Sequence, residues 1–338
     1  MESNTNVANN APTTDVIRAK QNVVFAVLTL LLNTAVIVSI ATSSFLRQKS
    51  KYRTIISISI GNIIACFAYF PLDTAKSLGF QGVQELNLTL KAFINGVHTF
   101  CVPAVIGFSL MFIGLEYCIT RKYGIIAHKR VSRTQISLWI PWTFGCVALL
   151  LLVLTPCPQV LTDYVNTQQI QAVTSPFNKK NVVVASPCQY IISLASILSL
   201  TIGWGFIPLL LAFLVVLYAI QLNVRYRLSR DYRQVVSSLT DSVTSDREVT
   251  WSQKLLDTAV ATFLLLGVHV LYLTQRLSEV TCLPESYCVM ALSANRSVEL
   301  ARWAMAFILP AVWLLDEDFR TVCAFICGRL CLGLSASG

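Results

Sequence analysis

Arg302 is the residue in this chain most able to take part in binding chemistry, because it lies inside a long apolar stretch, Val298–Leu315. An ionisable side chain is unfavourable in apolar surroundings and usually faces a cavity or a partner, and a guanidinium that faces a cavity attracts an anion or a carboxylate. Arg302 could instead extend toward water, or pair with Glu299 one turn earlier. The sequence leaves these three arrangements open.

The residues that usually carry catalysis or bind metals are sparse. The chain has 3 His, and no third His or Cys stands near His98 and His269 to suggest a metal site, so both are expected to be interior histidines. No Gly-rich phosphate loop, nucleophile elbow or zinc-binding His pair occurs in the sequence. We therefore expect neither an enzyme nor a bound cofactor or metal.

Seven long apolar stretches carry these residues. Hydrophobic residues make up 55% of the chain and charged residues 13%, against about 25% charged in an average soluble domain. Each stretch is long enough to cross a hydrocarbon core of about 30 Å as a helix, the element that satisfies its own backbone hydrogen bonds. The predicted spans are Asn22–Phe45, Thr54–Ser77, Leu90–Thr120, Gln135–Thr155, Tyr190–Asn223, Leu255–Leu277 and Val298–Leu315.

The predicted fold is therefore an all-α membrane protein, a seven-transmembrane helix bundle followed by a short amphipathic eighth helix. Residues 1–21 form an extracellular tail, residues 22–316 the bundle, and residues 317–338 the amphipathic helix with a short cytoplasmic tail. Residues 1–21 lack an apolar core typical of a cleaved signal peptide, so the first span is expected to target the chain to the membrane.

The basic residues predict the orientation. Most of the 26 Lys and Arg residues, which give the chain a net charge of +9, lie in four alternate connections, at 47–53, 121–133, 225–254 and 320–329. By the positive-inside bias these connections are cytoplasmic, and the N-terminus is outside. We expect a multi-pass protein of the plasma membrane, whose positive charge reflects its topology and not nucleic-acid binding.

Several residues outside the spans suggest covalent modification. Asn87 and Asn295 each begin a glycosylation sequon on the predicted outer side. Disulfides persist in that compartment, and two Cys pairs flank outer connections: Cys157 with Cys188, and Cys282 with Cys288. On the inner side, three Cys recur every four residues and are candidates for palmitoylation or for plain packing against the membrane. They are Cys323, Cys327 and Cys331.

Acidic residues near the ends of two spans have structural interpretations. Asp316, Glu317 and Asp318 follow the last span, where acids suit the positive N-terminal end of a helix dipole, so we expect them to cap the following helix. Asp73 and Lys76 are three residues apart near the outer end of the second span, which favours a local ion pair.

The order of particular residues along the chain indicates a resemblance to a known protein family. Over nearly its whole length the chain resembles the rhodopsin-like G-protein-coupled receptors, whose helices carry characteristic residues in a fixed order. The matching residues are Asn33 in the first span, Asn62 with Pro71 in the second, Glu116 within the run Ser109–Cys118 in the third, Trp142 in the fourth, Pro208 in the fifth, and Pro310 with Trp313 in the seventh.

Other positions depart from the family pattern. Tyr117 follows Glu116 where the family has an Arg that pairs with the acid, so the ion pair of the resting family members cannot form in the same way. Phe263, Gly267 and His269 align with the sixth-helix Phe-x-x-x-Trp-x-Pro pattern. A His does not remove a backbone hydrogen bond as Pro does, so we expect a straighter helix.

The resemblance implies a receptor for an extracellular small molecule or peptide that acts on a heterotrimeric G protein or arrestin. Within the family the chain is most similar to the fish-type odorant-receptor-like group, on Lys51-Tyr52 and on the run Glu116–Ile119, which implies chemosensory signalling. Ligand binding is expected in the outer half of the bundle. The candidate residues are His98, Thr99, Val102, His269, Tyr272, Arg302 and Trp303.

Two other functions stay open. The chain could be a relative of the receptors that has lost coupling and acts as a scavenger or trafficking partner. It could also be a small-solute transporter, although transporters usually show paired repeats with broken helices, and neither feature is evident in the sequence. If Arg302 faces the pocket, the ligand is anionic.

Overall fold

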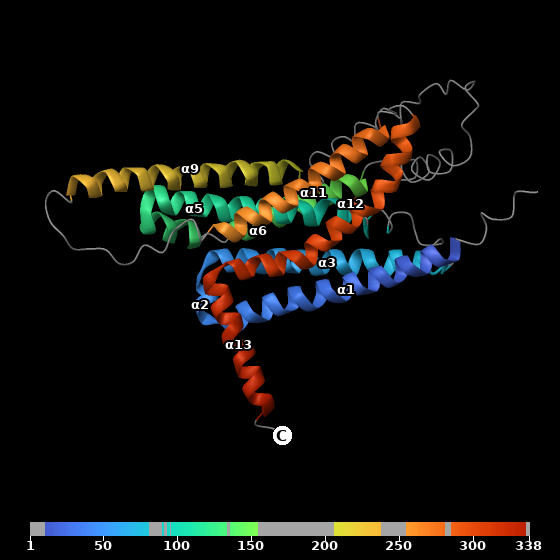
Figure 1. Cartoon of the computed structure of the whole chain (residues 1–338), viewed down its shortest axis with the longest axis horizontal. Helices are drawn as coiled ribbons and strands as arrows, with labels where there is room; N and C mark the ends of the chain where they lie inside the picture. Colours follow the sequence, from blue (N-terminus) through green and yellow to red (C-terminus); the bar gives the residue numbers. More distant parts are fainter. Residues whose placement is uncertain are drawn as a thin grey trace, which may run out of the picture.

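The computed structural model describes residues 11–80, 90, 93–94, 96–133, 136–154, 206–237, 255–280 and 285–335. These residues are almost entirely helical and contain no strand. The main helices are α1 (Ala11–Thr42), α2 (Ser44–Gln48), α3 (Ser50–Ser77), α5 (Val102–Arg133), α6 (Ile136–Leu154), α9 (Phe206–Ser237), α11 (Leu256–Val280), α12 (Glu285–Val312) and α13 (Glu317–Ser335) (Figure 1). A π-helical turn, η2 (Val97–Cys101), precedes α5, and a 3-10 turn, η4 (Trp313–Leu315), follows α12.

Five of the described helices are long and apolar enough to cross a membrane. They contain Val16–Thr42, Ser50–Ala75, Val102–Lys122, Phe206–Tyr226 and Leu256–Thr274, and they correspond to the first, second, third, fifth and sixth predicted spans. The apolar part of α12, Leu300–Leu315, is a shorter segment. The fourth predicted span corresponds to α6.

Several helices continue beyond the predicted spans. α1 begins at Ala11, inside the predicted N-terminal tail, α9 continues to Ser237, and α12 begins at Glu285. The cause is that a span is recognised from its apolar residues alone, whereas a helix also includes the polar turns that lie in the headgroup region or in water.

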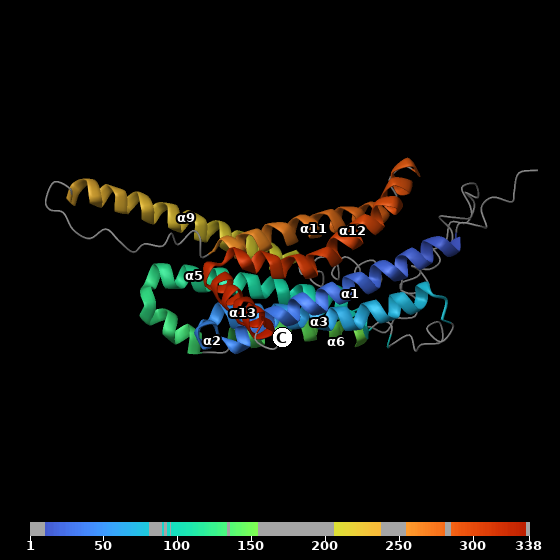
Figure 2. The same ribbon diagram turned by 60° about the horizontal axis from the view of Figure 1, so that its bottom comes forward.

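The helices pack as neighbours along their length. α1 lies beside α3, α5 beside α9, and α11 beside α12, as both views show (Figures 1 and 2). α13 turns away from the bundle at a steep angle. The core between the helices is apolar and includes fully buried Ile58, Val105, Leu110 and Leu209.

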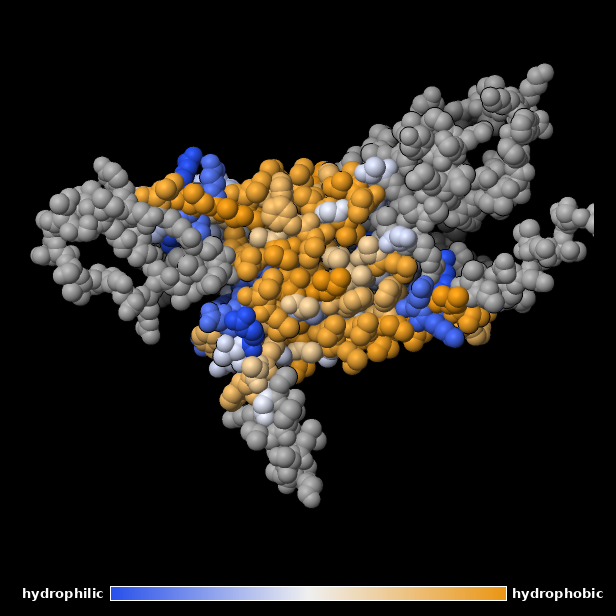
Figure 3. Space-filling model, in the orientation of Figure 1, coloured by the Kyte–Doolittle hydropathy of each residue, from blue (hydrophilic) through white to orange (hydrophobic). Residues whose placement is uncertain are grey.

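The outer surface is apolar as well. Large side chains such as Leu31, Phe67 and Leu271 are more than half exposed, and in Figure 3 a continuous apolar band lies between polar side chains at its two ends. A protein in water does not expose apolar area on this scale. The apolar helices and this band together indicate a membrane-embedded protein.

Small residues allow α5 and α9 to approach closely. A Cβ atom added to Gly107 would lie 2.7 Å from the Cβ atom of Pro208, and one added to Gly114 would lie 2.8 Å from a methyl carbon of Val215. Such contacts are too short for any residue with a side chain, and small residues are typical of close helix contacts in membranes. The two glycines therefore set the distance between α5 and α9.

The π-helical turn η2 has a local cause. The backbone N–H of Val102 donates to the carbonyl of Val97, five residues earlier. The next residue, Pro103, has no N–H to donate to Thr99, and its ring crowds that carbonyl. The wider turn accommodates the proline at the point where the chain enters α5.

An ion pair joins α1 to α3 at the end of the bundle away from α13. The guanidinium of Arg18 donates to both carboxylate oxygens of Asp73, at 2.6 and 2.9 Å, and the Asn22 amide donates to the same carboxylate at 2.7 Å. The carboxylate of Asp73 therefore bonds to a neighbouring helix, a partner that the local i, i+3 spacing with Lys76 did not predict. The side chain of Lys76 lies outside the described residues.

Candidate functional site

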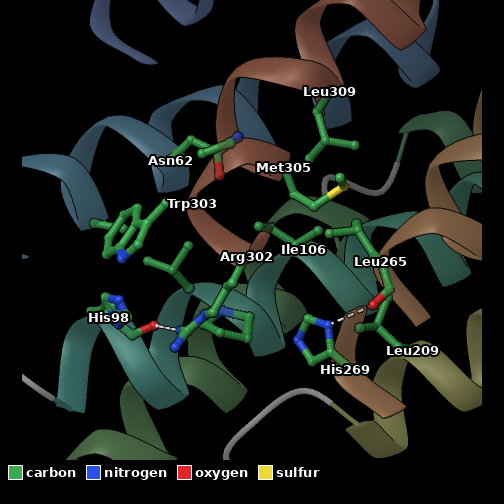
Figure 4. A pocket seen from close by; sticks show the side chains of 14 residues that line it. Asn62, His98, Ile106, Leu209, Leu265, His269, Arg302, Trp303, Met305 and Leu309 are labelled. Atoms are coloured by element: carbon green, nitrogen blue, oxygen red, sulfur yellow. Dashed lines mark hydrogen bonds between the residues drawn. The ribbon is translucent and has the colours of Figure 1, made fainter. Parts of the chain in front are cut away.

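A small cavity lies between α3, η2, α5, α9, α11 and α12 (Figure 4). Its volume is about 50 Å³, and five of the seven predicted ligand-binding residues line it: His98, Val102, His269, Arg302 and Trp303. Asn62, Ile106, Leu209, Leu265, Met305 and Leu309 also line it, and sequence reasoning did not place them there. The apolar ones look like ordinary core residues in the sequence.

The other two predicted ligand-binding residues are not brought to the cavity. Tyr272 is buried in α11 but is not among the residues that line the cavity. The side chain of Thr99 lies outside the described residues. Most of the predicted ligand-binding residues therefore lie together around one cavity.

Aromatic rings form one wall of the cavity. The Trp303 ring lies 4.3 Å from the His98 ring, 4.7 Å from Tyr69 and 4.3 Å from Phe70, measured between ring centroids. His98 and Trp303 are each 5% exposed. The two ring nitrogens of His98 and the Nε1 of Trp303 have no hydrogen-bond partner among the described residues. Buried polar atoms are normally satisfied, so these nitrogens leave unused hydrogen-bonding capacity in the wall of the cavity.

Arg302 lies beside this wall. Its Nη2 donates a hydrogen bond to the backbone carbonyl of His98, and the side chain is half-buried and lines the cavity. The structure thus places the Arg302 side chain at the cavity, as one of the arrangements predicted from the sequence has it, while the side chain of Glu299 lies outside the described residues. The residues of the π-helical turn supply the carbonyl, so the turn and Arg302 position each other.

His269 occupies the opposite side of the cavity. Its Nδ1 lies 2.7 Å from the carbonyl oxygen of Leu265, one turn earlier in α11 (Figure 4). A carbonyl accepts and cannot donate, so Nδ1 carries the proton. His269 is a buried interior histidine, as its sequence context predicts.

Asn33 joins three helices in the middle of the bundle. Its amide nitrogen donates to the carbonyls of Thr29 and Ala306, both at 2.8 Å, and its amide oxygen accepts from Asn62 at 3.2 Å. Pro310 has no N–H and leaves the carbonyl of Ala306, four residues earlier, without its helical donor. Asn33 supplies that donor, so two residues of the family pattern meet in one interaction.

A buried ionic group lies at the end of the bundle where α13 begins. Lys51 of α3 bonds through Nζ to Asp316 and, at 3.0 Å, to Asp257 of α11, while the Tyr52 hydroxyl donates to Asp316 at 3.0 Å. Asp257 is fully buried. We call Lys51, Tyr52, Asp257 and Asp316 the Lys51 network. It connects α3, α11 and the junction between α12 and α13.

Asp316 also caps α13, as predicted. One carboxylate oxygen accepts the backbone N–H groups of Asp318 at 3.0 Å and Phe319 at 3.4 Å. Asp316 lies just beyond the apolar segment Leu300–Leu315. Burial alone would raise the pKa of its carboxyl, but the Lys51 ammonium and the hydrogen bonds from Lys51 and Tyr52 lower that pKa below its ordinary value.

Sequence reasoning did not select Asp257. The available signal was an acid at the first turn of a predicted span, where a charge is rare. Lys51 appeared only as one of many basic residues in a connection. Their pairing depends on how α3 and α11 come together, which the local sequence does not show.

Three other positions of the family pattern lie in different surroundings. Trp142 of α6 donates from Nε1 to the Ser57 hydroxyl at 2.7 Å, and Trp313 is fully buried. Tyr117 packs in an apolar cluster with Cys118, Val216, Ala219 and Leu255. Its surroundings are therefore apolar at the position where the family pattern has a charged guanidinium.

Phe263 and Gly267 lie on the exposed face of α11. Phe263 is 47% exposed, and a Cβ atom added to Gly267 would meet nothing within 4 Å. The inward-facing residues of α11 at this depth are Leu265 and His269. Gly267, which aligns with the Trp of the family pattern, is therefore not a core position of α11.

The predicted modification sites lie mostly outside the described residues. The structure does not describe Asn87, Cys157, Cys188 and Cys282. It describes only the backbone of Cys288 and Asn295 in α12 and of Cys327 and Cys331 in α13. Cys323 is half-buried, with its thiol 3.8 Å from the Ser39 hydroxyl. Cys323, Cys327 and Cys331 do share one helix, α13.

The fold and the site together define a helical membrane protein with a small, mostly apolar cavity among its helices and a buried ionic network at one end. Comparison with protein-family models and with curated proteins gives no match.

Proposed function

We propose that this protein is a seven-helix receptor of the plasma membrane, in which a ligand at the cavity changes the position of α11 and thereby acts on a cytoplasmic partner. The observation that supports this proposal most strongly is that one helix carries part of both sites. Asp257 of the Lys51 network and His269 of the cavity lie in α11, about 18 Å apart at 1.5 Å per residue.

α11 is suited to transmit a movement. Its sequence contains no proline, and the interior of an unbroken helix moves as a rigid element. At the cavity, Leu265 and His269 face the aromatic wall and Arg302. At the other end, Asp257 is held by Lys51 of α3. A displacement of α11 at the cavity would therefore stretch or break the ion pair between Asp257 and Lys51.

The volume of the cavity supports a closed resting state. Pockets for drug-sized ligands usually have about 300–1,000 Å³, whereas this cavity has about 50 Å³. A larger ligand would gain room if α11 or α12 moved away from α5. Binding and helix displacement would then be the same event, as a receptor requires.

The end of the bundle with the Lys51 network would face the cytoplasm, by the distribution of basic residues. There α9 continues past its apolar part as far as Ser237, and the Arg121 guanidinium of α5 lies 3.5 Å from the Tyr226 ring centroid. This basic surface would contact a heterotrimeric G protein or arrestin. The similarity to odorant-receptor-like proteins makes chemosensory signalling the proposed role.

One observation favours an alternative. Tyr117 replaces the Arg through which the family contacts its G protein, and its side chain is buried among apolar residues. A receptor relative that binds its ligand without coupling, as a scavenger or trafficking partner, would tolerate this replacement.

Nucleotide exchange on a panel of purified G proteins, with the protein in lipid, separates the two functions. Asp257→Asn weakens the tie between α11 and Lys51, so we expect it to raise basal exchange above the wild type. Asp73→Asn removes a carboxylate at the opposite end and should leave exchange unchanged. Exchange no higher than in protein-free lipid for all three proteins would contradict the receptor proposal and favour the alternative.

A further inference from the structure

The polar atoms that face the cavity are dominated by hydrogen-bond donors. Arg302 offers N–H groups and no acceptor, and the Trp303 indole offers one N–H and no acceptor. His98, when neutral, adds one donor and one acceptor, and the His269 Nε2 on the opposite side is an acceptor. None of the described residues that line the cavity is acidic. An occupant of this cavity is therefore expected to be an acceptor of hydrogen bonds.

The donors lie close enough to share one occupant. Trp303 and His98 are in ring contact, at 4.3 Å between centroids, and Arg302 bonds to the His98 backbone. Figure 4 shows the Arg302 guanidinium beside His98, with His269 on the opposite side of the cavity. Both rings of the pair are nine-tenths or more buried, with nitrogens that have no partner among the described residues.

The size of the cavity restricts the occupant further. A volume of about 50 Å³ leaves room for only a few groups of the size of water, since about 10–15 Å³ of such cavity volume holds one water. Water could also bond to these nitrogens, whereas the Arg302 guanidinium favours an occupant that carries negative charge. A small anion only accepts, and the guanidinium would compensate its charge.

We infer that this cavity binds a small monovalent anion, either a halide such as chloride or a carboxylate of the size of formate. The Trp303 Nε1–H and a His98 ring N–H would donate to it, and Arg302 would supply the positive charge. As a statement of the receptor's ligand class this inference rests on the proposed function, but the binding can be measured without any signalling.

The test compares anions at constant ionic strength. We would measure the thermal unfolding of the purified full-length protein in lipid nanodiscs while sodium gluconate is replaced stepwise by sodium chloride or sodium formate. Gluconate has the same charge but is too large for the cavity. We expect a saturable rise in Tm with the small anions, since a ligand that binds the folded state stabilises it. The anion that saturates at the lower concentration identifies the halide or the carboxylate as the preferred class.

Two variants locate the site. Trp303→Phe keeps an aromatic ring against Tyr69 and Phe70 but removes the N–H, and Arg302→Gln removes the charge. Each should weaken the apparent anion affinity about tenfold or more, because one hydrogen bond to a charged group is lost. Lys49→Gln removes a cation at the surface of the bundle, where Lys49 pairs with Asp318, and should leave the affinity unchanged. If Arg302→Gln does not fold, Trp303→Phe decides alone.

Equal Tm values in chloride, formate and gluconate would overturn the inference and leave water as the occupant. Anion effects that persist unchanged in Trp303→Phe and Arg302→Gln would also overturn it, because the anion would then act elsewhere. Nucleotide exchange reports separately on the receptor proposal. Saturable binding without exchange would keep the anion site and contradict the receptor, and exchange without binding would do the reverse.

Discussion

At the scale of single residues, the interior polar side chains of this protein compensate for breaks in the helices. Asn33 donates to the Ala306 carbonyl, which Pro310 leaves without a backbone donor, and it accepts from Asn62. The sequence could assign Asn33, Asn62 and Pro310 to a family pattern. It could not show that they meet, because the contact between Asn33 and Ala306 joins α1 to α12.

Replacing Asn33 by Ala should lower the free energy of unfolding by about 1–2 kcal/mol, the upper range for hydrogen bonds between membrane helices. The reason is that the Ala306 carbonyl and the Asn62 amide would both lose a partner. Thermal unfolding in detergent would measure the change. Thr42→Val is a matched control, since Thr42 is exposed and bonds only within its own helix. Equal losses in the two variants would contradict this interpretation.

Asp316 predicts a dependence of stability on pH. Its folded pKa lies below the ordinary value of 3.8, so its carboxylate stabilises the fold at every pH above that value. This contribution is lost as the pH falls from about 3.8 through the lower folded pKa. The difference in Tm between the wild type and Asp316→Asn should stay constant from pH 7 to 5 and shrink below pH 4. A difference that shrank between pH 7 and 5 would contradict the lowered pKa.

At the scale of elements, the packing of α5 against α9 depends on two glycines that face the partner helix. Sequence reasoning identified Pro208 on α9 but gave no significance to Gly107, its contact. The hydrophobic pattern predicts that a helix exists and which residues are apolar. It does not predict which helices touch, because every face of a membrane helix can be apolar.

Gly107→Ala should therefore destabilise the protein by about 1–3 kcal/mol, the usual range for overpacking. The added carbon would lie 2.7 Å from Pro208 and 3.0 Å from the backbone nitrogen of Leu209, neither of which can move without shifting α9. Gly267→Ala makes the same substitution in open space and should be neutral or slightly stabilising. Thermal unfolding of the two variants side by side tests this, and a more stable Gly107→Ala would show that the helices are not in close contact.

The interactions between elements were also the least predictable part of the candidate site. Arg302, His98 and His269 could be selected from the sequence because charged and polar residues are rare in apolar stretches. The cap at Asp316 could be predicted because it is local. The pairing of Lys51 with Asp257, and of Arg18 with Asp73, joins residues far apart in the chain, and no local spacing indicates it.

At the scale of the whole molecule, polar interactions occupy three levels of an otherwise apolar bundle. Arg18 and Asp73 join α1 to α3 at one end, the Lys51 network joins α3 to α11 at the other, and the cavity lies between them. A charge left unpaired in a buried network is strongly destabilising. Each network therefore holds its helices in one arrangement until a partner or a ligand compensates for breaking it.

In the proposed receptor, the Lys51 network holds α11 in the resting position. The measurement that tests it most directly is the distance between spin labels at Gln48 and Leu256, both of which are exposed and lie on α2 and α11. The labels would be attached to introduced non-natural residues, because the chain has 11 Cys.

We predict one narrow distance distribution for the wild type and for Asp73→Asn, and a broader distribution shifted to longer distances for Asp257→Asn. A distribution for Asp257→Asn identical to that of the wild type would contradict the claim, because α11 would then keep its position without the network.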